Sequence, residues 1–165
     1  MPEPEVADAA APDPFASYRR QLRDPDETVR QSATLEIIRL GRPFSDELLL
    51  SALADSSPRV RQTAADGLIK LAEGELIEKL AEWLRLEDSL PRNQAMDVLT
   101  RLGRRSIPAL ENLLADSTDD VRLFATNVLG TIRDPAAFEA LVKMLKDPNE
   151  DVRYAAAESL GQIGE

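Results

Sequence analysis

The chain contains neither cysteine nor histidine among its 165 residues. Their absence excludes thiolate nucleophiles, Ser-His-Asp triads and zinc sites that use sulfur or imidazole nitrogen. The phosphate-binding patterns GxxxxGKS/T and GxGxxG are missing too, as is the spacing of an EF-hand loop. We therefore predict a protein without catalytic residues, cofactor or metal, and only a metal site made entirely of carboxylates stays open.

Aromatic residues and long apolar runs are also scarce. Aromatics make up 4% of the sequence, so a buried core must be aliphatic. Because no run of about 18 apolar residues occurs, no membrane-spanning helix is predicted. The opening stretch MPEPEVADAAAPDP lacks a basic segment followed by an apolar one, which argues against a signal peptide. By default these features predict a cytoplasmic protein, and the lack of cysteine fits a reducing compartment.

Positive charge is in the minority. Lysine and arginine number 20 against 30 acidic residues, which gives a formal net charge of −10. Nucleic acids and anionic membranes attract proteins with a positive field, so neither is an expected partner. The acids and prolines of residues 1–12 predict a disordered tail, and residues 13–165 have the length of a single domain.

What the sequence does contain is a repeat. It is marked by five arginines, spaced 31, 31, 30 and 31 residues apart: Arg30, Arg61, Arg92, Arg122 and Arg153. Leucine stands eight residues before each arginine, alanine three after it, and leucine or isoleucine seven and ten after it. So many positions in phase over five copies indicate true repeats. The expected repeats span approximately residues 13–42, 43–74, 75–104, 105–134 and 135–165.

Each repeat is predicted to form two helices. Apolar residues directly before the arginine and three, seven and ten after it share one face at about 3.6 residues per turn, and they define the second helix. A stripe upstream defines the first helix, for example Phe138, Leu141 and Leu145 in the last repeat. One helix pair cannot cover its own apolar face, whereas stacked pairs cover each other. The repeat therefore predicts an all-α stack.

The expected helix ends carry residues that favour capping. Aspartates six residues before the arginine are predicted N-caps of the second helix: Asp24, Asp55, Asp116 and Asp147. Glu27 and Glu150 stand three residues after two of them and predict capping boxes. Gly41, Gly103 and Gly164 follow second helices and are predicted left-handed C-caps.

The third repeat departs from the pattern. Leu86 replaces the expected aspartate, and Pro91 replaces valine directly before Arg92. Because proline is tolerated only in the first helical turn, the second helix should begin late, near Ser89. We expect a local irregularity in the stack at this repeat.

The motif DPxxxVRxxAxxxLxx(L/I)G resembles the short HEAT-like repeat named after phycobilisome lyases, and five copies cover residues 13–164. The resemblance implies an α-α superhelix, a right-handed solenoid of five stacked helix pairs, with recognition along a concave groove formed by the second helices. Some relatives are enzymes. Deoxyhypusine hydroxylases hold two irons with His-Glu pairs, which a chain without histidine cannot supply. Bilin lyase subunits attach pigments, so an accessory subunit or enzyme of that class is the alternative function.

Residues that recur in every repeat are expected to be structural, and residues that vary are candidates for function. The five arginines are therefore interpreted as a ladder that binds aspartates or carbonyls at the turns. On a helical wheel, the positions one and five after the arginine point away from the core, with positions two and nine at its flanks. These positions give the candidate partner-binding residues of the concave face: Gln62, Asp66, Asn93, Asp97, Leu123, Phe124, Asn127, Tyr154 and Glu158.

The candidates change character along the stack. The first three repeats present mainly amides and charges, whereas the last two place Leu123, Phe124 and Tyr154 where solvent is expected. An apolar cluster with a polar rim is typical of a partner site and predicts a non-catalytic scaffold or adaptor that binds a protein or peptide. The other interpretation is that Phe124 turns sideways between helices and Tyr154 packs beneath a further repeat.

Three weaker possibilities stay open. A basic line recurs nine residues after successive arginines, at Arg39, Lys70 and Arg101. Asp66 and Asp97 lie one turn from it and oppose nucleic-acid binding, and with Asn93 they are the candidate cluster for an enzyme. The last repeat keeps Leu160 and Ile163 in core phase without a polar closing helix, which predicts self-association through that repeat.

Overall fold

The computed structural model describes residues 13–163, and within them every regular element is helical. The predicted tail at residues 1–12 and the predicted cap Gly164 lie outside this range. The α-helices, in pairs from repeat 1 to repeat 5, are α1 (Ala16–Gln21) and α2 (Glu27–Leu40), α3 (Asp46–Leu53) and α4 (Pro58–Leu71), α5 (Glu75–Glu82) and α6 (Ser89–Leu102), α7 (Ile107–Leu113) and α8 (Asp119–Ile132), and α9 (Phe138–Met144) and α10 (Glu150–Ile163). Short 3-10 turns occupy Trp83–Arg85, Gly103–Ser106 and Pro135–Ala137.

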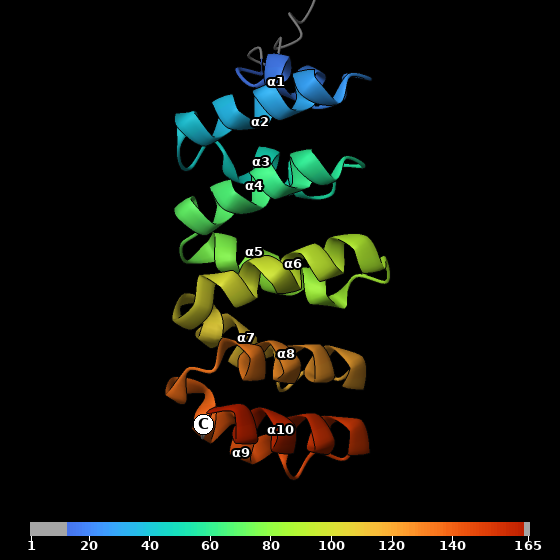
Figure 1. Ribbon diagram of the computed structural model, residues 1–165, viewed down its shortest axis with the longest axis vertical. Coiled ribbons are helices and arrows are strands. Elements are labelled where there is room, and N and C mark those ends of the chain that lie inside the picture. Colours follow the sequence, from blue (N-terminus) through green and yellow to red (C-terminus); the bar gives the residue numbers. More distant parts are fainter. Residues whose placement is uncertain (1–12, 164–165) are drawn as a thin grey trace, which may run out of the picture.

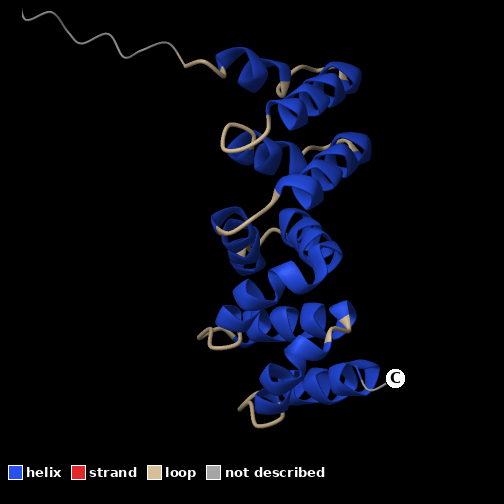
Figure 2. Ribbon diagram, turned by 90° about the vertical axis from the view of Figure 1, so that its left-hand side faces the viewer, coloured by secondary structure: helices blue, strands red, loops and turns tan. Residues whose placement is uncertain are grey.

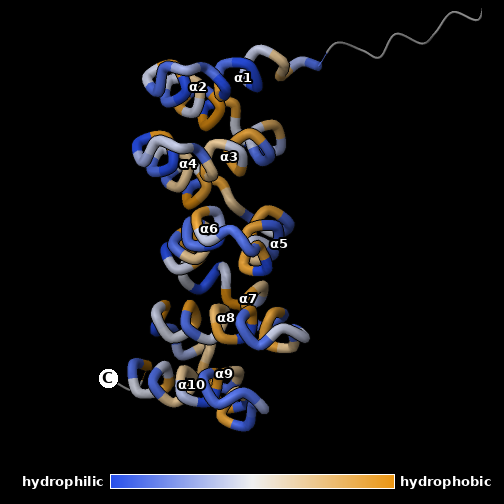
Figure 3. The backbone as a smooth tube through the Cα atoms, turned by 90° about the vertical axis from the view of Figure 1, so that its right-hand side faces the viewer, coloured by the Kyte–Doolittle hydropathy of each residue, from blue (hydrophilic) through white to orange (hydrophobic). Residues whose placement is uncertain are grey.

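The five pairs stack in chain order along the long axis of the molecule (Figure 1). The first helices form one layer and the second helices the other, as a side view of the stack shows (Figure 3). Consecutive second helices contact each other throughout, from α2 with α4 to α8 with α10. Helices and connecting turns account for the whole described stack (Figure 2). The prediction of an all-α right-handed solenoid of five stacked helix pairs is confirmed.

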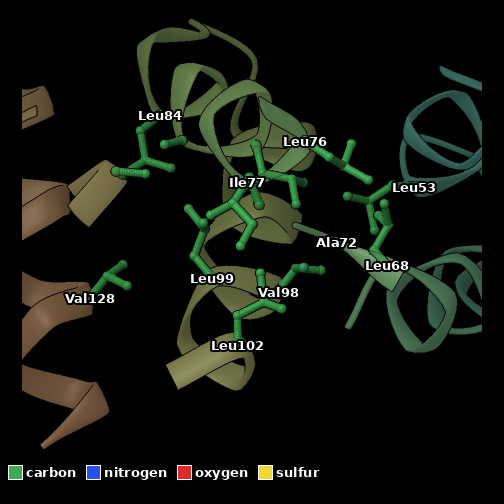
Figure 4. Packing of buried hydrophobic residues seen from close by; sticks show 14 of the residues in the cluster. Leu53, Leu68, Ala72, Leu76, Ile77, Leu84, Val98, Leu99, Leu102 and Val128 are labelled. Atoms are coloured by element: carbon green, nitrogen blue, oxygen red, sulfur yellow. The ribbon is translucent and has the colours of Figure 1, made fainter. Parts of the chain in front are cut away.

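An aliphatic core runs through all the pairs. Leu68 of α4 and Leu99 of α6 are fully buried, and so is Leu129 of α8. Residues of neighbouring repeats meet in this core, where Leu53 and Leu76 approach each other across the junction of repeats 2 and 3 (Figure 4). Burying one leucine side chain contributes about 2 kcal/mol, so the core outweighs any single surface ion pair at about 0–1 kcal/mol.

Small residues let some second helices approach closely. A Cβ atom added to Gly67 of α4 would lie 2.5 Å from Cγ1 of Ile38 in α2. A Cβ atom added to Gly130 of α8 would lie 2.1 Å from Oγ of Ser159 in α10. At both junctions a glycine on one helix therefore faces a larger residue on the next, and the backbones come closer than two side chains would permit.

The second helices begin later than the capping pattern predicts. The N-cap of α2 is Asp26, whose carboxylate accepts the amide hydrogen of Thr28. Asp24 instead accepts the amide hydrogen of Asp26 and closes an Asx turn ahead of the helix. The same turn is made by Asp55, Asp116 and Asp147. The prediction that these four aspartates are N-caps is wrong because each carboxylate accepts the amide hydrogen of the residue directly before the helix, and the helix itself begins one residue further on. Glu27 and Glu150 are first helical residues, so the capping boxes are wrong too.

The third repeat and the helix C-termini also test the sequence predictions. α6 begins at Ser89, as predicted, with Asp88 accepting the amide hydrogen of Leu90. Gly41 and Gly103 have positive φ values of 71° and 59°. Their ψ values of 179° and −132° lie outside the left-handed helical region, so the predicted type of C-cap is wrong at both.

Candidate functional site

The nine candidate residues lie along the outward side of the second helices, which we call the B face. Its members come from α4, α6, α8 and α10: Gln62, Asp66, Asn93, Asp97, Leu123, Phe124, Asn127, Tyr154 and Glu158. All except Leu123 and Phe124 are exposed. The helical-wheel assignment therefore places seven of nine side chains in solvent, over four consecutive repeats.

The apolar candidates are not equally accessible. Tyr154 is 73% exposed, whereas Leu123 and Phe124 are half-buried. Phe124 packs against the core, and the guanidinium carbon of Arg92 lies 4.8 Å from its ring centroid. This distance is typical of a cation-π contact between α6 and α8. Of the three residues, only Tyr154 has a side chain that is largely accessible to a partner.

The polar candidates of repeats 2 and 3 form a linked group. Arg101 donates to Asp66 at 2.6 Å and to Asp97 at 3.4 Å, so it bridges α4 and α6. Asp66 also accepts a hydrogen bond from Gln62 at 3.0 Å. The hydrogen bond to Asp66 raises the pKa of Arg101. The positive charge nearest these acids is thus neutralised locally, which weakens the basic line as a nucleic-acid site.

The arginine ladder binds carbonyl oxygens in every repeat. Nη1 of each ladder arginine donates to the carbonyls five and six residues earlier, in the turn before its own helix. In repeat 4, for example, Arg122 donates to Asp116 at 2.9 Å and Ser117 at 3.4 Å. These contacts hold the turn against the first part of the second helix.

Two ladder arginines also bind the next repeat. Nε and Nη2 of Arg30 donate to both carboxylate oxygens of Asp55, at 2.8 and 3.0 Å. Arg122 holds Asp147 in the same way at 2.8 and 2.9 Å. We call this bidentate contact the clasp. The hydrogen bond from Arg122 is the main cause that lowers the pKa of Asp147. Burial acts to raise the pKa of Asp55, but hydrogen bonds from Arg30 and the Ser57 amide outweigh it and leave that pKa lowered.

The clasp is altered around repeat 3. Leu86 stands where Arg61 would find its aspartate, and Arg61 bonds only to carbonyls among residues 13–163. Asp116 of repeat 4 accepts from Arg85 at 2.7 Å instead of from Arg92. The Nε of Arg92 is buried without a hydrogen-bond partner in the described stack. Sequence reasoning missed Arg85, because it lies outside the repeating positions.

Hollows on the described molecule lie away from the B face. One of about 280 Å³ is lined by the first helices of repeats 4 and 5, including Leu114, Ala140 and Met144. Another of about 190 Å³ is lined by α1 and α2 residues on the outer side of repeat 1. Within residues 13–163, no three acidic side chains gather in a way that could hold a metal ion. None of the helices in the same range combines the length and apolar character that crossing a bilayer requires.

Stacked helix pairs with an in-phase arginine and a continuous aliphatic core define the chain as a helical-repeat solenoid. A family model described as HEAT repeats matches residues 16–100 and 107–165. The chain therefore belongs to the HEAT-repeat family. None of the curated protein sequences matches it.

Several solved structures share the fold. Human deoxyhypusine hydroxylase in complex with glycerol is 25% identical with a TM-score of 0.52, over 92% of this chain and 63% of the other. The complex of CpcE and CpcF of phycocyanin lyase from Nostoc sp. is 22% identical with a TM-score of 0.45, over 99% and 70%. A designed armadillo repeat protein in complex with the peptide (KR)4 is 20% identical with a TM-score of 0.44, over 93% and 83%.

The first of these proteins is a hydroxylase, the second is a complex of phycocyanin lyase, and the third is a designed protein bound to a peptide. The chain spans less than two thirds of the hydroxylase chain, at 63%. Membership in the HEAT-repeat family defines the fold. It does not assign an activity, because function depends on the residues placed on the scaffold.

Proposed function

We propose that this protein is a non-catalytic scaffold that binds a protein or peptide along its B face. The observation that carries the proposal is the row of exposed, non-repeating side chains on consecutive second helices. Residues needed for stacking recur in each repeat, whereas Asn93, Asn127 and Tyr154 differ between repeats and remain in solvent. Such side chains contribute little to the core, so their chemistry is available for recognition.

The B face offers two kinds of contact. Tyr154, with 73% of its surface exposed, supplies an amphipathic aromatic ring of the type that is enriched at binding hot spots. Glu158 and Asn127 lie on the same side of α10 and α8 and supply acceptors and an amide. Asn93 and Asp97 continue the polar surface onto α6. The ligand would thus lie across several repeats, and Tyr154 in repeat 5 would be the aromatic residue that anchors it.

The direct test changes the exposed B-face residues and measures partner capture. A variant that combines Asn127→Arg, Tyr154→Ser and Glu158→Lys leaves the buried ladder intact. We expect it to lose the proteins that wild type enriches from a cell extract, as identified by quantitative mass spectrometry. The helical circular dichroism spectrum should match that of wild type. Phe124 is left unchanged because it packs against the core.

A matched control places charge on the opposite layer. Ser51 of α3 and Glu111 of α7 are exposed, so Ser51→Arg with Glu111→Lys changes the net charge by the same three units without touching the B face. This control should retain the captured proteins. Equal loss in both variants, or no loss in the B-face variant, would contradict the proposal.

The alternative is an accessory subunit or enzyme of the bilin-lyase-like class. The chain has no histidine, so it cannot supply the His-Glu iron ligands that deoxyhypusine hydroxylases use. The remaining candidates, Asp66 and Asp97, are both engaged by Arg101. Absorption spectra of the purified protein with and without added bilin separate the two functions, because only the alternative predicts a spectral change on binding.

A further inference from the structure

The two outer faces of the stack carry the two halves of one repeat–repeat junction. The C-terminal face is the side of repeat 5 away from repeat 4, with Leu145, Arg153, Ala157 and Gly161. The N-terminal face is the side of repeat 1 away from repeat 2, with Asp24 and a hollow lined mainly by α2. Internal junctions show, residue by residue, which groups meet across such a pair of faces.

Apolar residues of the C-terminal face are exposed where their equivalents are buried. Leu145 is 40% exposed, while the leucines at the same position in repeats 1 to 4 are at most 9% exposed: Leu22, Leu53, Leu84 and Leu114. Ala157 is exposed, whereas Thr34, Ala65 and Thr126 at its position are at most 2% exposed. Each of these equivalent residues lies against the following repeat. A surface like the N-terminal face of a repeat would therefore cover Leu145 and Ala157.

Arg153 carries half of a clasp. Its Nη1 binds the carbonyls of Asp147 and Pro148 at 2.8 and 2.9 Å, as every ladder arginine does in its own turn. Its Nε and Nη2 make no hydrogen bond to any residue from 13 to 163. In Arg122 those two nitrogens hold Asp147. The turn contacts therefore hold the guanidinium of Arg153 as they hold that of Arg122. The Nε and Nη2 atoms of Arg153 are left available for a carboxylate.

The N-terminal face carries the other half. Asp24 accepts the amide hydrogen of Asp26 at 2.9 Å, just as Asp147 accepts that of Asn149 at 2.9 Å. Asp147 is held in this turn while it receives Arg122. Asp24 makes no bond to an arginine of a preceding repeat within the described stack. It has the geometry of a clasp acceptor without its donor.

The hollow on the N-terminal face has the right position for the exposed residues of repeat 5. It measures about 190 Å³, and its lining is Gln21, Thr28, Val29, Ser32, Ala33 and Glu36. The positions equivalent to Glu36 in repeats 2 and 5 are Gly67 and Ser159, which face Ile38 and Gly130 of the repeat before. In both pairs one residue is a glycine and the other carries a side chain. Glu36 opposite Gly161 would follow the same rule, since a Cβ atom added to Gly161 meets no atom of residues 13–163 within 4 Å.

From these correspondences we infer that the C-terminal face of one molecule binds the N-terminal face of a second copy, head to tail, with Arg153 clasping Asp24 of its neighbour. Leu145 and Ala157 would enter the hollow beside Val29 and Ala33. The contact is heterologous, so it generates open chains of molecules and not a closed dimer. It uses the ends of the stack and is independent of partner binding by the B face.

Two features limit the strength of the contact. Each copy has a net charge of −10, so the molecules repel each other at low salt. Asp26 would lie near Glu150, where the internal junction of repeats 4 and 5 pairs Asn149 with Asp119. Association should therefore be weak at low ionic strength and should strengthen as salt screens the repulsion.

The test measures average molar mass by light scattering or sedimentation at protein concentrations up to about 1 mM, in low and moderate salt. Wild type should form a growing series of oligomers. Arg153→Gln and Asp24→Asn should each weaken association by about thirtyfold or more, because each leaves half of the clasp without its partner. A mixture of the two variants retains one wild-type contact, between Arg153 of one and Asp24 of the other. It should form a heterodimer that grows no further.

Arg61→Gln is the matched control, since Arg61 bonds only to the carbonyls of its own turn in the described stack but lies inside it. It should associate like wild type. The inference is overturned if wild type stays monomeric over the whole range, if Arg153→Gln associates as wild type does, or if the mixture stays monomeric. It is also overturned if Arg153→Gln abolishes association and Asp24→Asn leaves it intact, because that result indicates a contact between two C-terminal faces. The B-face change Tyr154→Ser, which keeps the net charge, should leave the association unchanged.

Discussion

At the residue scale, Arg122 shows how one side chain serves two purposes. One nitrogen binds carbonyls of its own turn, and the other two bind Asp147 of the next repeat. Arg122 is 9% exposed, and water cannot easily replace these contacts. Sequence periodicity identified the arginine, while the bonding pattern explains why lysine, a point charge without a planar fork, does not occupy the position in any repeat.

The clasp should have a measurable effect on stability. Arg122 and Arg61 both bind carbonyls of their own turn, but only Arg122 also binds a carboxylate, that of Asp147. Arg122→Gln therefore removes both kinds of contact, whereas Arg61→Gln removes only the carbonyl contacts. We expect Arg122→Gln to lower the free energy of unfolding by at least about 1.5 kcal/mol more than Arg61→Gln does. Denaturant titrations followed by circular dichroism give the difference. Equal losses would mean that the carboxylate contact adds nothing.

The clasp also predicts how stability depends on pH. Asp147 has its pKa lowered in the folded protein, chiefly by the hydrogen bond from Arg122. A carboxyl group with a lowered folded pKa stabilises fully above its unfolded pKa of about 3.9, and this contribution is lost as pH falls through the folded value. Stability should therefore decrease in acid from about pH 5 downward. Asp147→Asn should make that decrease shallower, with Asp55 still contributing. An unchanged slope in the variant would argue against the clasp as its source.

At the element scale, the junction of α8 and α10 depends on side-chain size. Gly130 and Ser159 face each other with no room for a further Cβ atom. The alanines three residues after each ladder arginine are buried as well, at most 3% exposed. The periodic alanines could be predicted from the sequence as close-approach positions. The pairing of Gly130 with Ser159 could not, because it depends on the register between two helices.

Gly130→Ala should therefore destabilise the protein although alanine favours helix. We expect a loss of about 1–2 kcal/mol, since overpacking outweighs the propensity gain of about 1 kcal/mol. Thermal unfolding measures this loss of stability. Adding Ser159→Gly should recover part of the loss by removing the opposing Oγ and Cβ atoms. Gly161→Ala is the control: it meets no atom within 4 Å and should stabilise α10 by about 0.5 kcal/mol. A stabilising effect at Gly130 would show that the helices separate without cost.

At the scale of the whole molecule, the junction between repeats 2 and 3 lacks the clasp that joins repeats 1 and 2 and repeats 4 and 5. Leu86 is 39% exposed at the position of the missing aspartate, and Arg61 has no carboxylate partner there among residues 13–163. Since each repeat is held mainly by its neighbours, a weaker junction lowers the free energy of separating the two halves of the stack. This junction is where we expect local opening.

Leu86→Asp should restore the clasp to Arg61. We expect a gain of up to about 1 kcal/mol and slower hydrogen exchange at the amides of α4 and α6. Leu90→Asp places the same charge at a residue that is 37% exposed in the first turn of α6, without a ladder arginine to receive it. That control should gain less protection, because only the helix dipole favours its charge. Equal protection in the two variants would show a general effect of acidic charge at the start of α6.

Much of this protein follows from its sequence alone. The period of the arginines and of the aliphatic stripe determines the number of helix pairs, their stacking and most of the buried residues, because helix periodicity and core burial are local consequences of residue order. The late start of α6 follows from Pro91 for the same reason. The exposed side of the second helices also follows from the wheel, as Asn93 and Glu158 show.

Other features were decided only by the tertiary structure. The sequence left open whether Phe124 joins an exposed apolar cluster or turns sideways between helices, and in the structure its ring packs beneath Arg92 of the neighbouring repeat. The aspartates before the second helices close Asx turns, where the pattern suggested helix caps. Arg85 substitutes for Arg92 at Asp116 because it lies within reach across the junction. Each of these depends on distances between repeats, and the order of residues within one repeat does not specify how far apart two repeats lie or which side chains fill the space between them.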